Sequence, residues 1–352
     1  MNKYKLNILF LFIILYKVIY LIINKSRKKI GVIGLRHSQN VGNNLLKYAI
    51  FIKLSELGYS PEIVGKRFEN HNISFISNIV KLRLINNFTE IKENDYDILM
   101  VNSDQTWMEW DEDFYDVAFL KFAENWEKPK FVYGTSIGDN NWMFSLKDEE
   151  IAKHLVTNFT GISVREKNLI HLIDKHLGFE SQLVLDPTLL IDKSHYLRLI
   201  KDFKSSLFNK AHKFEYIFVY ILIKTSRIIR YLKRVKKRLK LPIYIINVFN
   251  KDQVQEFLYG IINSKAVVTD SFHGTVFSII FKKPFVSFFG KTDSRFNNLF
   301  SILNIQNRKY KKNRFPPISL LTKKVIINES KLKSLKSESI KYLLNNLNHR
   351  VK

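Results

Sequence analysis

The chain has 352 residues, of which 46% are hydrophobic, 14% aromatic and 25% charged. This composition buries enough apolar surface to offset chain entropy, which excludes a protein that is disordered throughout, and the length indicates roughly two domains. The absence of cysteine excludes disulfides, thiolate nucleophiles, iron–sulfur clusters and zinc sites with sulfur ligands. Any catalytic group must therefore use oxygen or nitrogen.

The charge of the chain is strongly positive. Lysine and arginine number 57, aspartate and glutamate 32, and the net charge is +25. Such a field concentrates anions, whether nucleic acid, acidic lipid or a phosphorylated substrate. A lysine-rich composition whose side chains are simply solvated is the alternative interpretation.

An apolar segment runs from Leu6 to Ile23, interrupted by Asn7 and Lys17. As a helix its 18 residues would span about 27 Å, close to the hydrocarbon thickness of a bilayer. Basic residues follow at Lys25, Arg27, Lys28 and Lys29. The positive-inside rule then places the body of the protein on the cytoplasmic side, and no small-residue cleavage site follows the segment. We expect residues 1–29 to be a retained anchor at the cytoplasmic face of the cell membrane; an interfacial helix and an ordinary buried helix are the alternatives.

The next residues predict a βαβ unit. Its parts are a buried strand at Ile30–Leu35, a polar loop at His37–Asn43, a helix at Asn44–Leu57 and a strand at Pro61–Val64. Further strands are predicted at Ile98–Asn102, Phe131–Thr135, Ile162–Val164 and Leu183–Leu185. Short apolar runs that alternate with helices predict an α/β domain with a parallel sheet covered on both faces.

The second half of the chain repeats this alternation. We expect strands at Tyr216–Ile223, Ile243–Val248, Ala266–Thr269 and Phe285–Phe288, with helices at Ser226–Leu239, Asp252–Asn263 and Gly274–Phe281. The predicted domains are 30–190 and 191–325, followed by a C-terminal helix and tail at 326–352. Ligands of paired α/β domains bind in the cleft at the carboxyl ends of the strands.

Two motifs follow predicted strands. In Thr269–Thr275, His273 stands beside Gly274 and Thr275 at a helix start, which places an imidazole next to unpaired backbone N–H groups and would suit a phosphate or carboxylate. A simple N-cap with a satisfied histidine is the alternative. In Asn102–Trp107, Asp104 could accept a proton or hold a hydroxyl, while an Asx turn is equally compatible.

Other motifs carry less information. Arg165 follows the strand Ile162–Val164. Its planar guanidinium could donate two parallel hydrogen bonds to a carboxylate or phosphate, or it could form a structural salt bridge. The polar loop His37–Asn43 could line the cleft with its backbone. No Walker pattern occurs, which excludes P-loop chemistry, and the scattered histidines form no HExxH pair, so we expect no metal.

One predicted helix carries a dense basic face: Lys224, Arg227, Arg230, Lys233, Arg234, Lys236, Lys237, Arg238 and Lys240. We interpret it as a solvated helix face that also contacts an anionic membrane surface. A nucleic-acid groove is the alternative, but the helix lacks the repeated aromatic residues of a single-strand platform, so we expect no nucleic acid as a partner.

Taken in order, these segments resemble the polysaccharide pyruvyl transferase family, from about Ile30 to Leu303. The matching residues are Asn40–Asn43, Leu46, Tyr48, Ala49, Asp97, Ser103–Trp107, Tyr133–Gly138, Ser163–Glu166, Asp186–Thr188, Asp270–Thr275, Pro284, Phe285 and Ser294–Phe296. The chain departs from the family at Asn102, where glycine is frequent, and in its first 29 residues.

The resemblance implies two Rossmann-like domains in a GT-B-like arrangement, with the acceptor side at 30–190, the donor side at 191–325 and the active site between them. It implies transfer of the pyruvyl group of phosphoenolpyruvate onto two hydroxyls of a sugar as a cyclic ketal, with release of phosphate and no cofactor. The acceptor would be a glycan or lipid-linked oligosaccharide of a capsule, exopolysaccharide or cell wall. Rival readings are a nucleotide-sugar-dependent glycosyltransferase and a non-catalytic glycan-assembly protein.

The resemblance also implies roles for individual residues. Arg165 corresponds to the donor-binding arginine and His273 to the donor-contacting histidine, for which we expect proton donation to the methylene carbon. Some relatives carry a basic residue where this chain has Ser271, so Arg295 or the amides of Gly274 and Thr275 would hold the donor's anions. Asp104 is the candidate base. Remaining candidate substrate-binding residues are Asn40, Asn43, Ser103 and Gln105.

Overall fold

The computed structural model describes residues 27–34, 40–67, 75–108, 112–204, 215–246, 253–289, 293–311 and 315–349. The apolar segment Leu6–Ile23 lies outside the described residues, so the membrane anchor stays a prediction. Within the described ranges, no helix is both long enough and apolar enough to cross a bilayer.

The first lobe is built on a seven-stranded parallel sheet in the order β3-β2-β1-β4-β5-β6-β7. Its strands are β1 Lys29–Ile33, β2 Ser60–Lys66, β3 Leu82–Ile85, β4 Ile98–Val101, β5 Lys130–Thr135, β6 Gly161–Val164 and β7 Ser181–Leu183. The second lobe is built on a five-stranded parallel sheet in the order β12-β11-β10-β8-β9. Its strands are β8 Ile217–Tyr220, β9 Ile243–Ile245, β10 Ala266–Thr269, β11 Phe285–Phe289 and β12 Lys309–Lys311.

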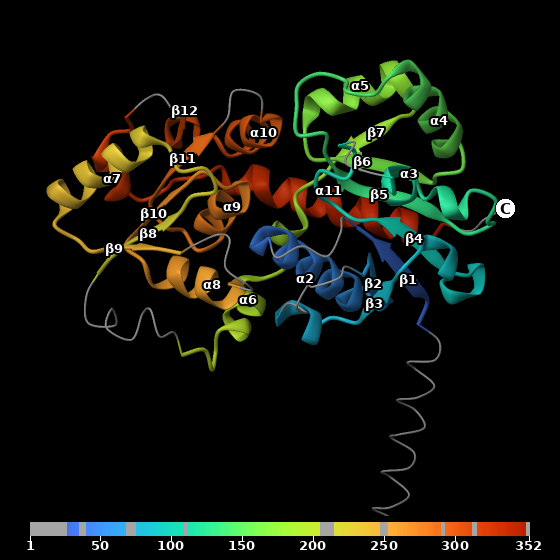
Figure 1. Ribbon diagram of the computed structural model, residues 1–352, viewed down its shortest axis with the longest axis horizontal. Coiled ribbons are helices and arrows are strands. Elements are labelled where there is room, and N and C mark those ends of the chain that lie inside the picture. Colours follow the sequence, from blue (N-terminus) through green and yellow to red (C-terminus); the bar gives the residue numbers. More distant parts are fainter. Residues whose placement is uncertain are drawn as a thin grey trace, which may run out of the picture.

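Helices cover both sheets, so the predicted α/β class with parallel sheets is confirmed (Figure 1). They are α2 Val41–Glu56, α3 Phe114–Phe119, α4 Leu146–Val156, α5 Lys167–Leu177, α6 Lys193–Leu199, α7 Ser226–Leu239, α8 Val254–Asn263, α9 Phe272–Ile280, α10 Ser294–Leu303 and α11 Glu329–Leu347. The predicted division at residue 190 falls in the segment that joins the two sheets.

Several predicted boundaries were wrong, and local contacts explain them. Helix α2 begins three residues before the predicted start, because the Asn40 side chain accepts a hydrogen bond from the Asn43 N–H and caps it. Helix α9 begins two residues early, because Ser271 caps it in the same way. Strand β7 lies at Ser181–Leu183 rather than Leu183–Leu185, since the Leu185 N–H bonds to the Ser339 hydroxyl of α11.

Two strands, β3 and β12, were not predicted. Each is the edge strand of its sheet, and each carries polar side chains, Leu-Arg-Leu-Ile in β3 and Lys-Tyr-Lys in β12. An edge strand is covered less completely than a central one, so it lacks the continuous apolar run from which the other strands were recognised.

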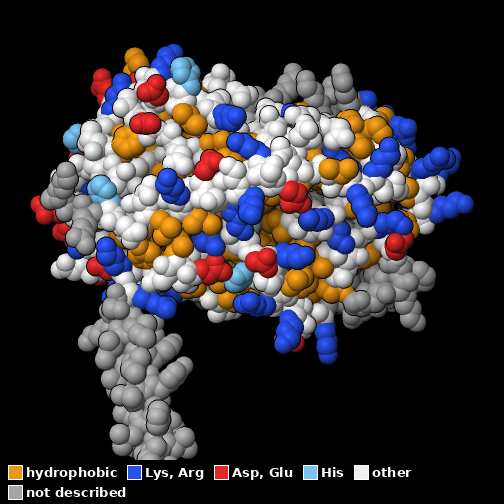
Figure 2. All heavy atoms as spheres, turned by 180° about the vertical axis from the view of Figure 1, so that it is seen from behind, with side chains coloured by type: hydrophobic (Ala, Val, Ile, Leu, Met, Phe, Trp, Pro, Cys, Tyr) orange, Lys and Arg blue, Asp and Glu red, His pale blue; other side chains and the backbone are white. Residues whose placement is uncertain are grey.

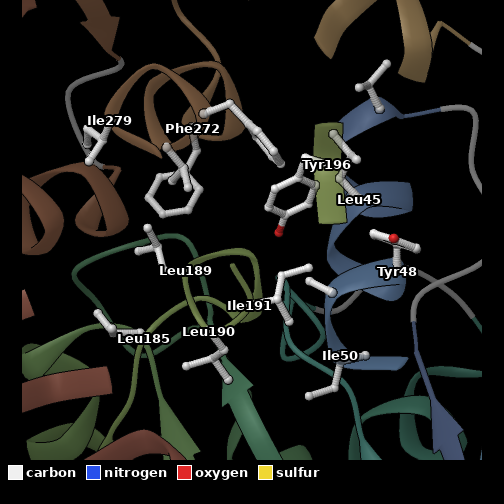
Figure 3. Close-up of a cluster of buried hydrophobic side chains, with 14 of the residues drawn as sticks. Leu45, Tyr48, Ile50, Leu185, Leu189, Leu190, Ile191, Tyr196, Phe272 and Ile279 are labelled. Carbon is white, nitrogen blue, oxygen red and sulfur yellow. The ribbon is translucent and has the colours of Figure 1, made fainter. Parts of the chain in front are cut away.

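The inner faces of the two sheets share one hydrophobic core. Because side chains alternate across a strand, Phe131 and Tyr133 of β5 join this core while Val132 joins a separate cluster on the outer face. In the second lobe Phe218 of β8 likewise points inward and Val219 outward. The segment between the lobes fills the space with a group of apolar side chains drawn in Figure 3, which include Leu185, Leu189, Leu190, Ile191 and Tyr196.

Helix α11 ties the second lobe back to the first (Figure 1). The Tyr342 hydroxyl donates to the Val132 carbonyl at 2.8 Å, and the Ser339 hydroxyl accepts from the Leu185 N–H at 2.9 Å. Leu343 is fully buried in the shared core. The end of the described chain is therefore part of the first lobe's packing.

Leu343→Ala should lower the free energy of unfolding by about 3 kcal/mol, because it removes a buried side chain and leaves a cavity. Urea denaturation measures the change. Lys341→Ala, on the exposed side of the same helix, is the control and should change stability by less than about 0.5 kcal/mol. An equal loss in both variants would mean that α11 does not pack as described.

Candidate functional site

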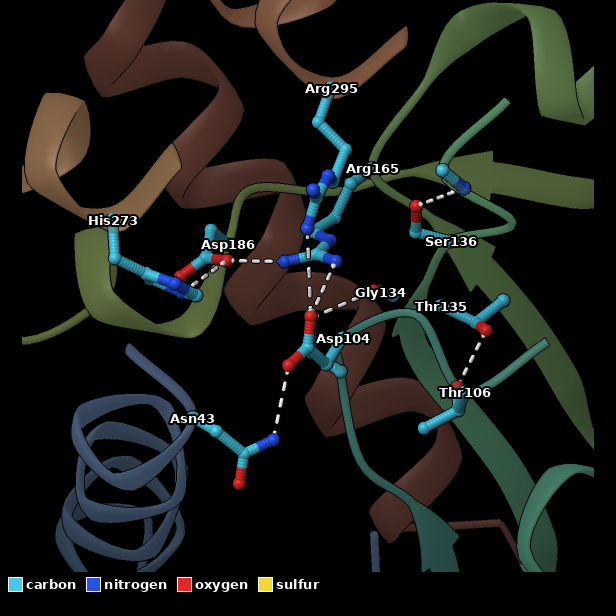
Figure 4. A network of polar contacts seen from close by, with 12 residues as sticks. Asn43, Asp104, Thr106, Gly134, Thr135, Ser136, Arg165, Asp186, His273 and Arg295 are labelled. Carbon is cyan, nitrogen blue, oxygen red and sulfur yellow. Dashed lines mark hydrogen bonds and ion pairs between the residues drawn. The ribbon is translucent and has the colours of Figure 1, made fainter. Parts of the chain in front are cut away.

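The predicted site residues gather where the strands of both sheets end. The order of each sheet reverses between β1 and β4 in the first lobe and between β8 and β10 in the second, and ligands of open parallel sheets bind at such points. Asp104 follows β4, Arg165 follows β6 and His273 follows β10. Figure 4 shows these side chains converging from the two lobes.

Asp186 lies at the centre of the network. Its Oδ2 accepts a hydrogen bond from Arg165 Nη1 at 2.7 Å and lies 3.6 Å from His273 Nε2. Its Oδ1 accepts from the backbone N–H and the hydroxyl of Thr188, at 3.0 and 2.6 Å. Arg165 of the first lobe and His273 of the second thus face each other with this carboxylate between them (Figure 4).

The charge on Asp186 is held by its neighbours. Burial by itself would raise the pKa of this carboxyl, but His273, Arg165 and the Thr188 hydroxyl together bring the pKa well below its usual range. Asp186 is therefore held in its ionised form, and it orients both the guanidinium and the imidazole.

Asp104 forms the second acidic position. Its carboxylate accepts a hydrogen bond from Asn43 Nδ2 at 3.0 Å and lies 3.4 Å from Arg165 Nη2 and 3.7 Å from Arg295 Nη1. Burial would raise the pKa of Asp104, but Arg165, His273, Arg295 and Asn43 lower it. Asp104 is therefore an ionised carboxylate, and it becomes a stronger base only when a bound group draws the arginines away from it.

The backbone of Asp104 is strained. Its φ of 123° lies in the region that favours glycine. The surrounding loop holds it there: the Ser103 hydroxyl donates to the Gly134 carbonyl at 2.7 Å, and the Thr106 and Thr135 hydroxyls lie 2.7 Å apart. Strain that is maintained by such contacts is typical of functional positions, which supports Asp104 as one.

Two arginines bracket one aromatic ring. The guanidinium of Arg165 lies 5.5 Å, and that of Arg295 5.2 Å, from the ring centre of Phe272 in the first turn of α9. Arg295 is also fixed by Asp293, whose carboxylate accepts from its Nε at 3.1 Å and its Nη2 at 3.0 Å. Phe272 and the Asp104 carboxylate, which lies within 3.7 Å of both guanidiniums, thus offset the repulsion between the two cations.

His273 crosses from the second lobe onto helix α2 of the first. A Cβ at Gly42 would lie 2.1 Å from His273 Nδ1, closer than any side chain allows. Only glycine at this position lets the imidazole approach the helix. One ring nitrogen is therefore packed against α2 while the other is directed at Asp186.

Further contacts close the lobes around Arg165. The Asn298 amide of α10 donates to the Arg165 carbonyl at 2.5 Å. Glu166 is buried and accepts hydrogen bonds from Ser136 of the first lobe and from Ser294 of the second, the latter at 3.3 Å. Burial raises the pKa of Glu166 although Arg165 and Ser136 oppose this.

The expectation for the amides of Gly274 and Thr275 was wrong. The Gly274 N–H bonds to the Ser271 hydroxyl at 3.2 Å, and the Thr275 N–H bonds to the Ser271 carbonyl at 3.1 Å. The Thr275 hydroxyl contacts Ser271 and Ser287. Because α9 starts at Phe272, these groups belong to its N-cap and first turn, so Ser271 also acts as the cap.

Some of the other predicted side chains contact Asp104, and the rest stabilise the loops that carry the site. Asn43 and Arg295 reach Asp104, as described above. Asn40 caps α2, Ser103 bonds to the Gly134 carbonyl, and Gln105 packs so closely on Gly138 that a Cβ there would meet its amide at 1.9 Å. These three residues shape the loops on which the network stands.

Four residues of the site were not assigned a role from the sequence. Asp186 and Gly42 stood within matching segments, but nothing in the sequence told them from ordinary turn residues. Phe272 reads as a core residue by its type. Lys47 is buried one helical turn after Asn43, where burial lowers its pKa to about 8 and Asp104 opposes the shift.

Two parallel-sheet lobes with a site between their strand ends define a GT-B-like fold. The sequence matches the model of the polysaccharide pyruvyl transferase family over residues 40–288. This match covers more than half of the chain, so the protein belongs to that family and is a transferase. A search of curated proteins finds no match.

Solved structures share the architecture at low identity. UDP-GlcNAc 2-epimerase from Neisseria meningitidis, bound to UDP-GlcNAc, gives a TM-score of 0.58 at 9% identity over 91% of this chain and 99% of that one. The enzyme from Methanocaldococcus jannaschii gives 0.57 at 10% over 90% and 99%. MnaA from S. aureus, with UDP, gives 0.53 at 13% over 92% and 99%. Such likeness shows the fold alone.

Gly42→Ala should reduce transferase activity by at least about 100-fold, because the added methyl group displaces the His273 imidazole from α2 and Asp186. Turnover of the purified variant measures the loss, and circular dichroism checks the fold. Gly65→Ala is the matched control, since a Cβ there meets no atom within 4 Å. Full activity of Gly42→Ala would contradict the described position of His273.

Lys47 should make the free energy of unfolding increase with pH in the alkaline range. Its pKa of about 8 lies below that of an unfolded lysine, so the unfolded state binds more protons above pH 8 and stability should rise with pH. Between pH 7 and 9.5 the gain should be about 2 kcal/mol. Urea denaturation of wild type and Lys47→Met should show this rise only in wild type; Lys341→Met, on the surface, is the control. Parallel curves for wild type and Lys47→Met would contradict the assignment.

Proposed function

We propose that the protein transfers the pyruvyl group of phosphoenolpyruvate to a sugar of a surface polysaccharide, or of its lipid-linked precursor, as a cyclic ketal. The observation that carries this proposal is the meeting of Arg165 and His273 at Asp186, with Arg295 beside them. Two guanidiniums and an imidazole at one point suit a small donor that carries both a carboxylate and a phosphate.

The lengths of the contacts support a donor position between the two arginines. Arg165 is held firmly by Asp186 at 2.7 Å, but the distances from Asp104 to Arg165 and Arg295 are 3.4 and 3.7 Å. The looser pairs are the ones that an incoming anion can replace at least cost. A donor anion bridging Arg165 and Arg295 would free the Asp104 carboxylate to face the acceptor hydroxyl.

The proposed reaction uses His273 as the acid and Asp104 as the base. His273 gives a proton to the methylene carbon of the donor, and positive charge develops on the adjacent carbon. One sugar hydroxyl attacks that carbon and passes its proton to Asp104. A second hydroxyl then attacks and passes its proton to the now neutral His273, while the bond to phosphate breaks and phosphate departs. The Asp186 carboxylate stabilises the charged imidazole before the transfer.

The charge of the protein supports the proposed acceptor class. A lipid-linked oligosaccharide carries phosphate, which the net charge of +25 attracts. The predicted anchor at Leu6–Ile23 would hold the enzyme at the cytoplasmic face of the membrane, where such a precursor is assembled. Capsule, exopolysaccharide and cell-wall glycans are all compatible with this acceptor.

His273→Ala should lower phosphate release from phosphoenolpyruvate in the presence of acceptor glycan by about 100-fold or more, because the proton donor is lost. His154→Ala is the control: this histidine is 70% exposed and pairs with Glu124 on the surface, so activity should be unchanged. The ketal should be detected by mass in the wild-type product only.

One further comparison separates this proposal from a nucleotide-sugar enzyme. Three similar folds are UDP-sugar enzymes or hold UDP. A thermal-shift measurement should show stabilisation of wild type by phosphoenolpyruvate and less in Arg165→Lys, which keeps the charge but loses the planar fork. Stabilisation by UDP without any by phosphoenolpyruvate would contradict pyruvyl transfer.

A further inference from the structure

Helix α7 carries a stripe of arginines that the site between the lobes does not use. Arg227, Arg230, Arg234 and Arg238 recur at spacings of three, four and four residues, so they lie along one side of the helix. The chain has 14 arginines and 43 lysines. A compositional preference for lysine would not place four of the 14 arginines within 12 residues.

The sequence around this helix carries no acidic residue. Between Glu215 and Asp252 the sequence contains no aspartate or glutamate, and nine basic residues fall between Lys224 and Lys240. In Figure 2, lysine and arginine side chains gather at the end of the molecule that the second lobe forms. The field at this end therefore favours an anionic partner.

The structure holds part of the stripe in place. The guanidiniums of Arg227 and Arg234 lie 4.7 and 4.8 Å from the ring centre of Phe315. That ring is stacked on Tyr231, with 6.4 Å between ring centres and 19° between planes. Arg227 Nε is buried and has no hydrogen-bond partner among the described residues. These arginines are positioned by packing rather than extended freely into solvent.

A groove of about 930 Å³ runs beside the stripe. One wall presents Arg234, Lys237 and Arg238, and the other is formed by residues 315–319 with Thr322. Phe315, Pro316, Pro317 and Ile318 make this second wall largely apolar. Cations facing an apolar wall suit an amphiphile, whose phosphate binds the cations while its hydrocarbon lies along the wall.

Exposed apolar side chains flank the basic face. Ile229, on α7, is 46% exposed, and Ile223, just before the helix, is 61% exposed. Ile229 lies on the same side of α7 as Lys233 and Lys236, so it would enter the headgroup region of a bilayer on which these lysines rest. A partner that is only charged, such as a nucleic acid, would not need these apolar side chains.

We propose that α7 and the groove beside it form a docking surface for an anionic lipid bilayer, with lipid phosphate groups bound by Arg234, Lys237 and Arg238. This surface belongs to the second lobe and is separate from the predicted anchor at Leu6–Ile23. It fixes the orientation of the second lobe on the membrane.

Hydrogen exchange of the full chain tests the proposed docking surface, because it reports on individual segments whether or not the predicted anchor inserts into the membrane. Vesicles of phosphatidylcholine mixed with phosphatidylglycerol should slow exchange in residues 226–239 and 315–322 at least about threefold, and pure phosphatidylcholine vesicles should not. High salt should remove the effect, because the attraction is screened.

A charge-matched pair of variants completes the test. Arg234→Glu combined with Arg238→Glu should abolish the protection, whereas Lys331→Glu combined with Lys333→Glu, on exposed α11 positions, makes the same change in net charge and should keep it. Equal protection by neutral vesicles, by inorganic phosphate alone or by single-stranded RNA would overturn the proposal, as would equal loss in both variants. Phosphate release from phosphoenolpyruvate tests the proposed reaction independently of this surface.

Discussion

A single buried carboxylate organises the meeting of the two lobes. Asp186 comes at the end of the first sheet, yet it binds Arg165 of its own lobe and lies next to His273 of the other. Removing the Asp186 carboxylate would leave the buried Arg165 guanidinium without its closest partner. An unpaired buried charge destabilises a protein far more than an apolar pair in the same place. The close fit of the imidazole against Gly42, the two cations on Phe272 and the release of Asp104 toward an acceptor all depend on Asp186 being charged and fixed.

Asp186 and Asp104 both contact Arg165, but their surroundings suit them to different roles. Asp186 has four contacts and sits deep in the protein, so it is suited to hold other groups in position. Asp104 has longer contacts to the arginines and a strained backbone, so it is suited to change partners during a reaction. The difference between the two is made by their surroundings, since both are aspartates next to Arg165.

Much of the fold could be predicted from the sequence, because central strands of parallel sheets are continuous apolar runs and the helices between them have regular spacing. Strand β10 and helix α7 were predicted at their exact bounds. The edge strands β3 and β12 were missed, since little covers them, and the starts of α2 and α9 were misplaced, since single side chains cap them. At the site, their type and their place after strands made His273, Asp104 and Arg165 candidates, and the resemblance to the family gave them roles. The role of Asp186 could not be predicted, because it depends on how two distant segments pack, and Gly42 matters only through a contact with a residue of the other lobe.

The position of α11 bears on how the protein is made. Residues 329–347 complete the core of the first lobe, bonding to Val132 and Leu185. During synthesis on the ribosome, α11 can cover the inner face of the first sheet only after some 150 residues beyond the last strand of that sheet have emerged. The nascent chain therefore exposes Phe131 and Tyr133 for a long interval, and its cellular yield should depend on chaperones that shield such a face.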